Sequence, residues 1–151
     1  MQGVRPFLDR EAASEMADHL SVLNAAAGKA DRALIALASI ELYRVLVSSV
    51  SGKTKIPVSV SLMDYAGFRY SADLKADPIR WSDMRKAAMF AEQEWQMLAP
   101  EVASRGLASE VGRTVAAMAG AAEHKDPSTA RRSVKAELEL VDQLETHFVS
   151  G

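Results

Sequence analysis

The three histidines are the side chains of this sequence best suited to proton transfer or metal ligation near neutral pH. They are His19, His124 and His147, and imidazole is the side chain that changes charge closest to that pH. None of them follows a glutamate by three residues, the spacing that carboxylate-bridged di-iron bundles use. Glu15 lies one helical turn before His19, so these two are expected to form a surface pair. We therefore expect no di-iron centre.

A second short motif suggests phosphate binding. The residues 51–54 read Ser-Gly-Lys-Thr, the end of a P-loop. The full motif requires a further glycine five positions before Gly52, where Val47 stands, and a strand that leads into the loop. No serine has a histidine and an acid at a spacing typical of a catalytic triad. We therefore predict no nucleotide binding and no enzymatic activity, and expect a binding or interaction module.

An aromatic group with one arginine is the most distinctive candidate for a recognition surface. Residues 51–77 connect two expected helices, and about 25 residues is long compared with the usual 2 to 8 in helical bundles. Large rings beside a cation are common at binding surfaces. The predicted ligand or partner surface consists of Tyr65, Phe68, Arg69, Tyr70 and Trp81. The alternative is a hydrophobic lid over one end of the bundle, since Tyr65 and Phe68 have core spacing.

Two other patterns indicate contact with a partner. Ile56, Val58 and Val60 alternate with other residues in the period of a strand, so two copies pairing these segments would form a homodimer. Arg131 and Arg132 stand near the start of the last expected helix, where the helix dipole disfavours cations. That placement marks a candidate contact site.

Residues 78–98 are expected to form the central helix. Apolar residues recur there at three- and four-residue steps, and both tryptophans, Trp81 and Trp95, lie on the stripe. Asp77 is the predicted N-cap, Pro78 suits the first helical position, and Pro100 discourages continuation. Trp95→Ala is expected to cost about 3 to 5 kcal/mol if the ring is enclosed. The residues expected to be buried are Trp81, Trp95, Leu37, Leu138 and Val141.

The remaining chain also shows helical periodicity. Residues 9–27 begin at an Asp9 cap, and residues 29–50 continue the pattern as the second arm of a hairpin or as one helix bent at Gly28. An extended crossover and a short helix over residues 61–76 follow, and helices are expected after Pro100 and after the Asp126 cap. The predicted fold is an all-α, up-and-down four-helix bundle with an extra short helix in a long crossover, as a single domain over residues 1–151.

Composition narrows the classes of partner. The chain has 151 residues, 48% of them hydrophobic, a formal net charge of −2 and no cysteine. A nearly neutral charge provides no strong field for phosphate backbones, so no nucleic-acid partner is expected. Lack of cysteine removes thiolate metal sites and disulfides. No apolar run approaches the roughly 18 to 20 residues of a membrane span, and no signal peptide is evident, so a soluble chain is expected.

Two resemblances add further expectations. In an up-and-down bundle the start of the first helix lies beside the end of the last, and Met16 and His147 occupy those places. This resembles the b-type cytochrome four-helix bundles and implies haem or metal binding by Met16 and His147 as the alternative function. Residues 78–148, which close in LVDQLETHF, resemble small helical-bundle proteins that bacteria export. That resemblance implies a periplasmic location if Met1 begins a trimmed mature chain, and a cytoplasmic one otherwise.

Overall fold

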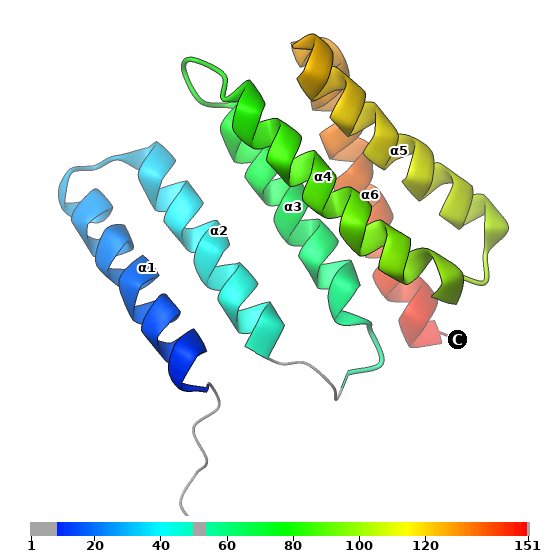
Figure 1. Ribbon diagram of the computed structural model, residues 1–151, viewed down its shortest axis with the longest axis horizontal. Coiled ribbons are helices and arrows are strands. Elements are labelled where there is room, and N and C mark those ends of the chain that lie inside the picture. Colours follow the sequence, from blue (N-terminus) through cyan, green and yellow to red (C-terminus); the bar gives the residue numbers. More distant parts are fainter. Residues whose placement is uncertain (1–8, 50–53, 151) are drawn as a thin grey trace, which may run out of the picture. The chain divides into compact units, whose positions relative to one another are not determined.

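The computed structural model describes residues 9–49 and 54–150, and within these ranges all regular secondary structure is helical (Figure 1). Six α-helices and one short 3₁₀ helix occupy the described residues, which contain no strand. The all-α class predicted from the sequence is therefore confirmed. None of the described helices combines the length and the apolar character that crossing a membrane requires.

The chain divides into two compact units, residues 1–53 and 54–151. In the first unit, α1 (Arg10–Gly28) and α2 (Arg32–Ser49) pack against each other. The Asp9 carboxylate accepts a hydrogen bond from the Ala12 amide, which confirms the predicted cap. The chain leaves the helix after Gly28 and a second one begins at Arg32, so the hairpin is present and the single bent helix is not.

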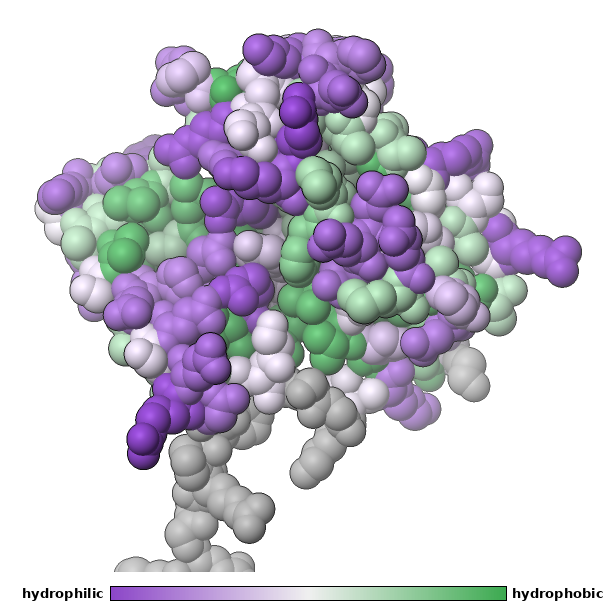
Figure 2. All heavy atoms as spheres, in the orientation of Figure 1, coloured by the Kyte–Doolittle hydropathy of each residue, from purple (hydrophilic) through white to green (hydrophobic). Residues whose placement is uncertain are grey.

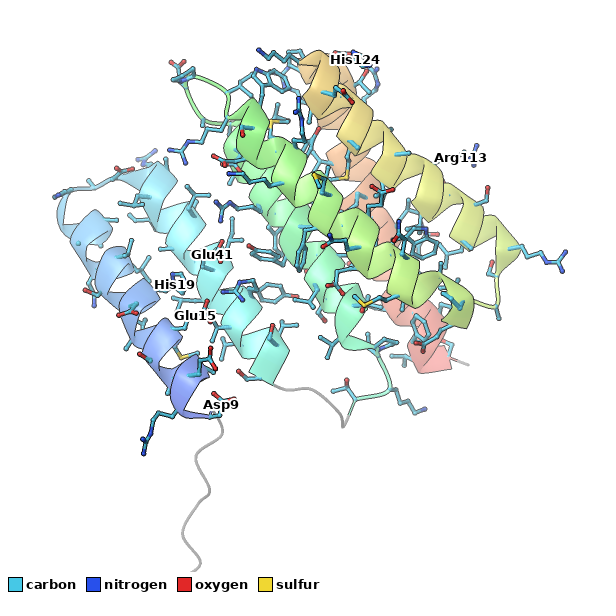
Figure 3. The ribbon with its side chains drawn as sticks, viewed as in Figure 1. Asp9, Glu15, His19, Glu41, Arg113 and His124 are labelled. Carbon is cyan, nitrogen blue, oxygen red and sulfur yellow. The ribbon has the colours of Figure 1, made fainter. Side chains whose placement is uncertain are left out.

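An ion cluster joins the two helices of this hairpin. Arg44 on α2 forms an ion pair with Glu15 on α1 and a second, at 3.1 Å, with Glu41 on its own helix. The imidazole of His19 lies 3.6 Å from Glu15, as expected for a surface pair. Figure 3 shows Glu15 and His19 on α1 and Glu41 on α2. The side chains in these contacts are partly exposed. Through its contact with Glu15, His19 has a structural role.

The hairpin buries little apolar surface. Within α1 and α2 the buried residues are Ala26, Ala38 and Val45. Larger apolar side chains on the same helices are exposed, and Figure 2 shows apolar surface over the hairpin. These exposed side chains are Leu20, Val22, Leu34 and Leu46. Two helices alone have too few facing positions to enclose side chains of this size.

The second unit contains four longer helices. These are α3 (Val58–Leu74), α4 (Trp81–Leu98), α5 (Arg105–His124) and α6 (Pro127–Ser150), with the 3₁₀ helix η1 (Ala99–Glu101) after α4. Helix α3 packs against α4 and α6, and α5 packs against the same two helices. Figure 1 shows these four helices side by side. The core lies among all four.

Two clusters of buried residues make up this core. One surrounds Trp95 and includes Val60, Met63, Leu98, Val111, Leu140 and Leu144. The other surrounds Tyr70 and includes Met84, Ala88, Met118, Ala122 and Val134. Both clusters take residues from α3, α4, α5 and α6, so each helix contributes one apolar stripe to a shared interior.

The connection predicted for residues 51–77 is mostly a full helix, which corrects two expectations. Val58 and Val60 lie in the first turn of α3 and not in an extended crossover, so this segment offers no strand for pairing across a dimer axis. The short helix expected from residue 61 starts three residues earlier and spans 17 residues. Burial of Val60, Met63 and Tyr70 on one helical face outweighs the preference of β-branched residues for strands.

The central helix α4 begins later than predicted. It starts at Trp81, so Asp77 and Pro78 precede it and do not form its cap. Instead the Arg80 carbonyl accepts hydrogen bonds from the amides of Asp83 and Met84. Five stripe residues are buried as expected, namely Met84, Ala88, Ala91, Trp95 and Leu98.

Burial of the five residues singled out from the sequence is mixed. Trp95 and Val141 are buried as predicted. Trp81, Leu37 and Leu138 are only half-buried, which corrects the prediction for these three. Trp81 is the first residue of α4, where fewer neighbours surround a side chain.

Candidate functional site

The predicted aromatic surface is split between the core and the exterior. Tyr70 is completely buried, and its hydroxyl donates a 2.9 Å hydrogen bond to the Met118 carbonyl oxygen. Burial raises the pKa of Tyr70 to about 12, and a hydrogen bond with Ser133 opposes that shift. Because a partner cannot reach this side chain, we assign Tyr70 to the core.

The other four members have separate surroundings. The ring of Tyr65 meets Phe90 edge-on with centroids 5.5 Å apart, and Trp81 packs against the core cluster around Tyr70. The Arg69 guanidinium lies 3.4 Å from the buried carboxylate of Asp73. Phe68 is 38% exposed and remains an accessible ring. Tyr65 and Trp81 therefore make packing contacts, as the alternative of a hydrophobic lid would require.

A groove lies beside this region, between the end of α3 and the first half of α6. It encloses about 560 Å³, within the range of about 300 to 1,000 Å³ typical of small-molecule sites. We call it the α3–α6 groove. Its lining residues are Ser71, Leu74, Lys75, Ala76, Asp77, Ile79, Arg131, Val134, Lys135 and Leu138.

The groove combines an apolar floor with a basic rim. Leu74 and Val134 are buried at the floor, and Ile79 and Leu138 are half-buried beside them. The rim carries three exposed cations, Lys75, Arg131 and Lys135, and one exposed acid, Asp77. Lys135 lies 3.7 Å from Glu139. The arrangement can accept a molecule that is apolar along its length and polar at one end.

Two of these cations have no partner within residues 9–49 and 54–150. Among the residues that the structure describes, neither the Lys75 ammonium nor the Arg131 guanidinium forms a hydrogen bond or an ion pair. Arg132, the neighbour of Arg131, instead donates to the hydroxyls of Ser128 and Thr129 at 2.7 and 3.0 Å. The two arginines noted in the sequence thus differ, and Arg131 alone borders the groove.

Buried carboxyl groups form a second unusual feature of this unit. Glu137 on α6 is 1% exposed, and neither of its carboxyl oxygens has a hydrogen-bond partner among the described residues. Burial raises the pKa of Glu137 well above the usual value for glutamate, and repulsion from Asp64 raises it further. The carboxyl group lies against Gly67 on α3, where a β-carbon would overlap Glu137 Oε2 and approach Leu138 Cδ2 to 2.8 Å. The helical spacing of the sequence indicated no polar partner for Glu137.

Asp73 and Glu94 are also buried. Burial raises the pKa of Asp73, while the nearby Arg69 guanidinium lowers it. Burial likewise raises the pKa of Glu94, which a hydrogen bond with Ser59 opposes. The helical pattern of the sequence puts Glu94 on a polar face, and its 6% exposure corrects that prediction. The packed helices of this unit enclose both Glu94 and Asp73.

The residues of the alternative haem or metal site lie in different units. Met16 is on α1 in the first unit, and His147 is on α6 in the second. The His147 ring contacts Phe148 with centroids 5.3 Å apart. The described residues contain no group of three or more histidine, aspartate or glutamate side chains arranged to hold a metal. Ligation of haem or a metal by Met16 and His147 stays a prediction.

The P-loop-like motif of residues 51–54 cannot be compared in the same way, because its residues 51–53 lie outside the described residues.

Known proteins provide no further guide to this site. No family model, curated protein or solved structure matched the chain. Among the residues of the groove, the sequence had indicated the unusual position of Arg131. It had not indicated Lys75, Lys135 or the apolar floor.

Proposed function

We propose that this protein is a non-catalytic binding or interaction module and that the α3–α6 groove is its ligand site. The observation that carries the proposal is the apolar floor of Leu74, Val134 and Leu138 beneath a rim of cations. Apolar hollows with a few polar groups at their edge are the usual form of small-molecule sites. We propose the groove in place of the predicted surface of Tyr65, Phe68, Arg69, Tyr70 and Trp81, and both lie near the start of α4.

We further propose that α3 to α6 act as the scaffold of this site in the form of an up-and-down four-helix bundle. Short connections join successive helices, and α6 packs against α3 as well as α5. Such neighbours in a bundle are antiparallel. The membership differs from the sequence-based bundle, because α3 is a full member and residues 9–49 belong to another unit.

Amide chemical shifts of the full chain test the groove as a binding site. Titration with small compounds that have an apolar part and a neutral or charged end should shift the amide resonances of Leu74, Ile79, Val134 and Leu138. Ala76→Trp should abolish these shifts, because the indole would occupy the groove that Ala76 lines. Ala103→Trp is the matched control, since Ala103 is exposed in another connection. Absence of shifts at the groove for every compound would contradict the proposal.

The location and the haem alternative remain predictions. Export to the periplasm rests on the resemblance of residues 78–148 to exported helical bundles, and haem binding rests on Met16 and His147. A Soret band that appears on addition of haemin and is lost in Met16→Ala and His147→Ala would favour the haem alternative.

A further inference from the structure

We propose that the ligand of the α3–α6 groove is a single-chain anionic amphiphile of the fatty-acid type. Its chain would lie on the apolar floor, and its carboxylate would contact the cations of the rim. This inference rests on the proposed function of the groove and adds the chemical class of the ligand. The occupant we infer is a free molecule in solution and not a lipid held in a membrane.

The charges at the rim favour an anionic head group. Lys75, Arg131 and Lys135 face the groove with Asp77 as the one acid among its lining residues. The side chains of Lys75 and Arg131 have no partner among the described residues, so a ligand carboxylate would meet no internal competitor there. A guanidinium can hold a carboxylate through two parallel hydrogen bonds.

The position of Arg131 supports the same conclusion. It lies near the start of α6, where the positive end of the helix dipole disfavours a cation and favours an anion. The Asp126 carboxylate already accepts hydrogen bonds from the amides of Ser128 and Thr129 at that helix start. The Arg131 guanidinium, exposed at the rim, is therefore the group of α6 that a ligand carboxylate would contact.

The floor favours an aliphatic chain over a ring system. Leu74, Ile79, Val134 and Leu138 provide aliphatic surface, and the residues that line the groove include no aromatic side chain. A nucleotide base binds best when it can stack on such a ring. Aliphatic methylene groups need only apolar contact, which this floor supplies.

The net charge favours a free ligand over a membrane surface. The chain carries a formal net charge of −2, so its overall field does not attract an anionic bilayer. Three of its 18 basic residues, Lys75, Arg131 and Lys135, line the groove. A monomeric amphiphile can enter that groove without bringing the rest of the protein to a charged surface.

Calorimetric titration of the full chain with matched twelve-carbon compounds tests the inference. Dodecanoate should bind more tightly than dodecanol, and dodecyltrimethylammonium should bind most weakly, each being used below its solubility limit or critical micelle concentration. Arg131→Gln should weaken dodecanoate binding by about five- to tenfold and leave dodecanol unchanged. Lys75→Gln should act in the same direction. Arg85→Gln is the matched control, because Arg85 is exposed on α4 away from the groove.

Chain length tests the floor independently of the rim. Affinity should rise by about fourfold for each methylene added from octanoate until the floor is covered. Amide shifts should fall on the groove residues throughout the series. Circular dichroism should show that the rim variants keep their helical content, since the substituted side chains are exposed.

Three results would overturn the inference. Equal binding of dodecanol and dodecanoate, with no effect of Arg131→Gln, would rule out selection for an anionic head group. The proposed function of the groove would then still stand. Failure of every compound to shift the groove amides would remove both proposals. Binding to vesicles of phosphatidylglycerol without binding of free dodecanoate would replace the soluble ligand with a membrane surface.

Discussion

Gly67 and Glu137 lie opposite each other where α6 packs against α3, and their sizes are matched. A β-carbon at position 67 would overlap the Glu137 carboxyl and press on Leu138. We predict that Gly67→Ala lowers the free energy of unfolding by about 1 to 3 kcal/mol through overpacking. Urea denaturation of the variant and the parent protein measures this change.

A matched glycine separates packing from helix propensity. A β-carbon at Gly120, within α5, would meet nothing within 4 Å, so Gly120→Ala should stabilise by up to about 1 kcal/mol. In a Glu137→Ala background, Gly67→Ala should cost less, because the carboxyl that it displaces is absent. An equal cost in both backgrounds would show that Glu137 does not restrict position 67.

The buried Glu137 carboxyl should make stability depend on pH. Because its pKa is raised in the folded chain, the folded state retains a proton that the unfolded state releases above the usual glutamate value of 4.5. Stability is therefore greatest below that pH and falls as the pH rises through the pKa of the folded state. We predict that Glu137→Gln reduces this fall, because the amide cannot ionise. Denaturation at a series of pH values from about 4 to 8 measures the fall in the free energy of unfolding.

Other groups contribute to the same profile. The pKa values of Asp73 and Glu94 are also raised by burial, so the variant should flatten the profile without abolishing its slope. Glu139→Gln on the same helix controls for loss of a negative charge, since Glu139 is 62% exposed. If Glu137→Gln and Glu139→Gln give the same profile, burial of Glu137 is not the cause.

At the scale of elements, two similar sequences begin their helices differently. Asp126 accepts hydrogen bonds from the amides of Ser128 and Thr129 at 2.9 and 3.1 Å, which confirms its predicted cap. Asp77 precedes α4 by several residues, and its side chain makes no hydrogen bond within the described residues. We predict that Asp126→Ala lowers the melting temperature by about 2 to 4 °C. Asp77→Ala should leave it unchanged.

Differential scanning calorimetry of the two variants decides between these roles. Asp77 and Asp126 are each followed by a proline. The two sites are therefore matched in composition, and only their local geometry differs. A loss for Asp77→Ala as large as that for Asp126→Ala would mean that Asp77 caps α4 after all. The measurement thus tests where α4 begins.

At the scale of the whole molecule, the two units should differ in local stability. The buried residues of α1 and α2 are small, whereas α3 to α6 bury Tyr70, Trp95, Met63 and Met118. We predict that amide hydrogens of α1 and α2 exchange with solvent faster than those of α3 to α6. Hydrogen exchange of the full chain, followed by mass spectrometry, measures this. Equal protection across both units would contradict the prediction.

The sequence by itself determined the helical class, the caps at Asp9 and Asp126, and the apolar stripe from Met84 to Leu98. These features depend on residues within a few turns of one another, so periodicity and side-chain chemistry suffice to find them. The turn at Gly28 was also predicted, although a hairpin could not be distinguished from a bent helix. Contacts between α1 and α2, such as that of Arg44 with Glu15, settled the matter.

Only the tertiary structure decided what depends on contacts between distant segments. Val58 and Val60 read locally as extended, but burial of Val60 with residues of α4 and α6 favours the helical conformation of this segment. The helical pattern put Glu94 on a polar face, and packing of the neighbouring helices buries it. Glu137 is buried as well, which its local sequence did not indicate. The α3–α6 groove likewise joins Lys75 to Arg131 across more than fifty positions of sequence. No local pattern records such a distance, because packing of whole helices brings the two side chains to one groove.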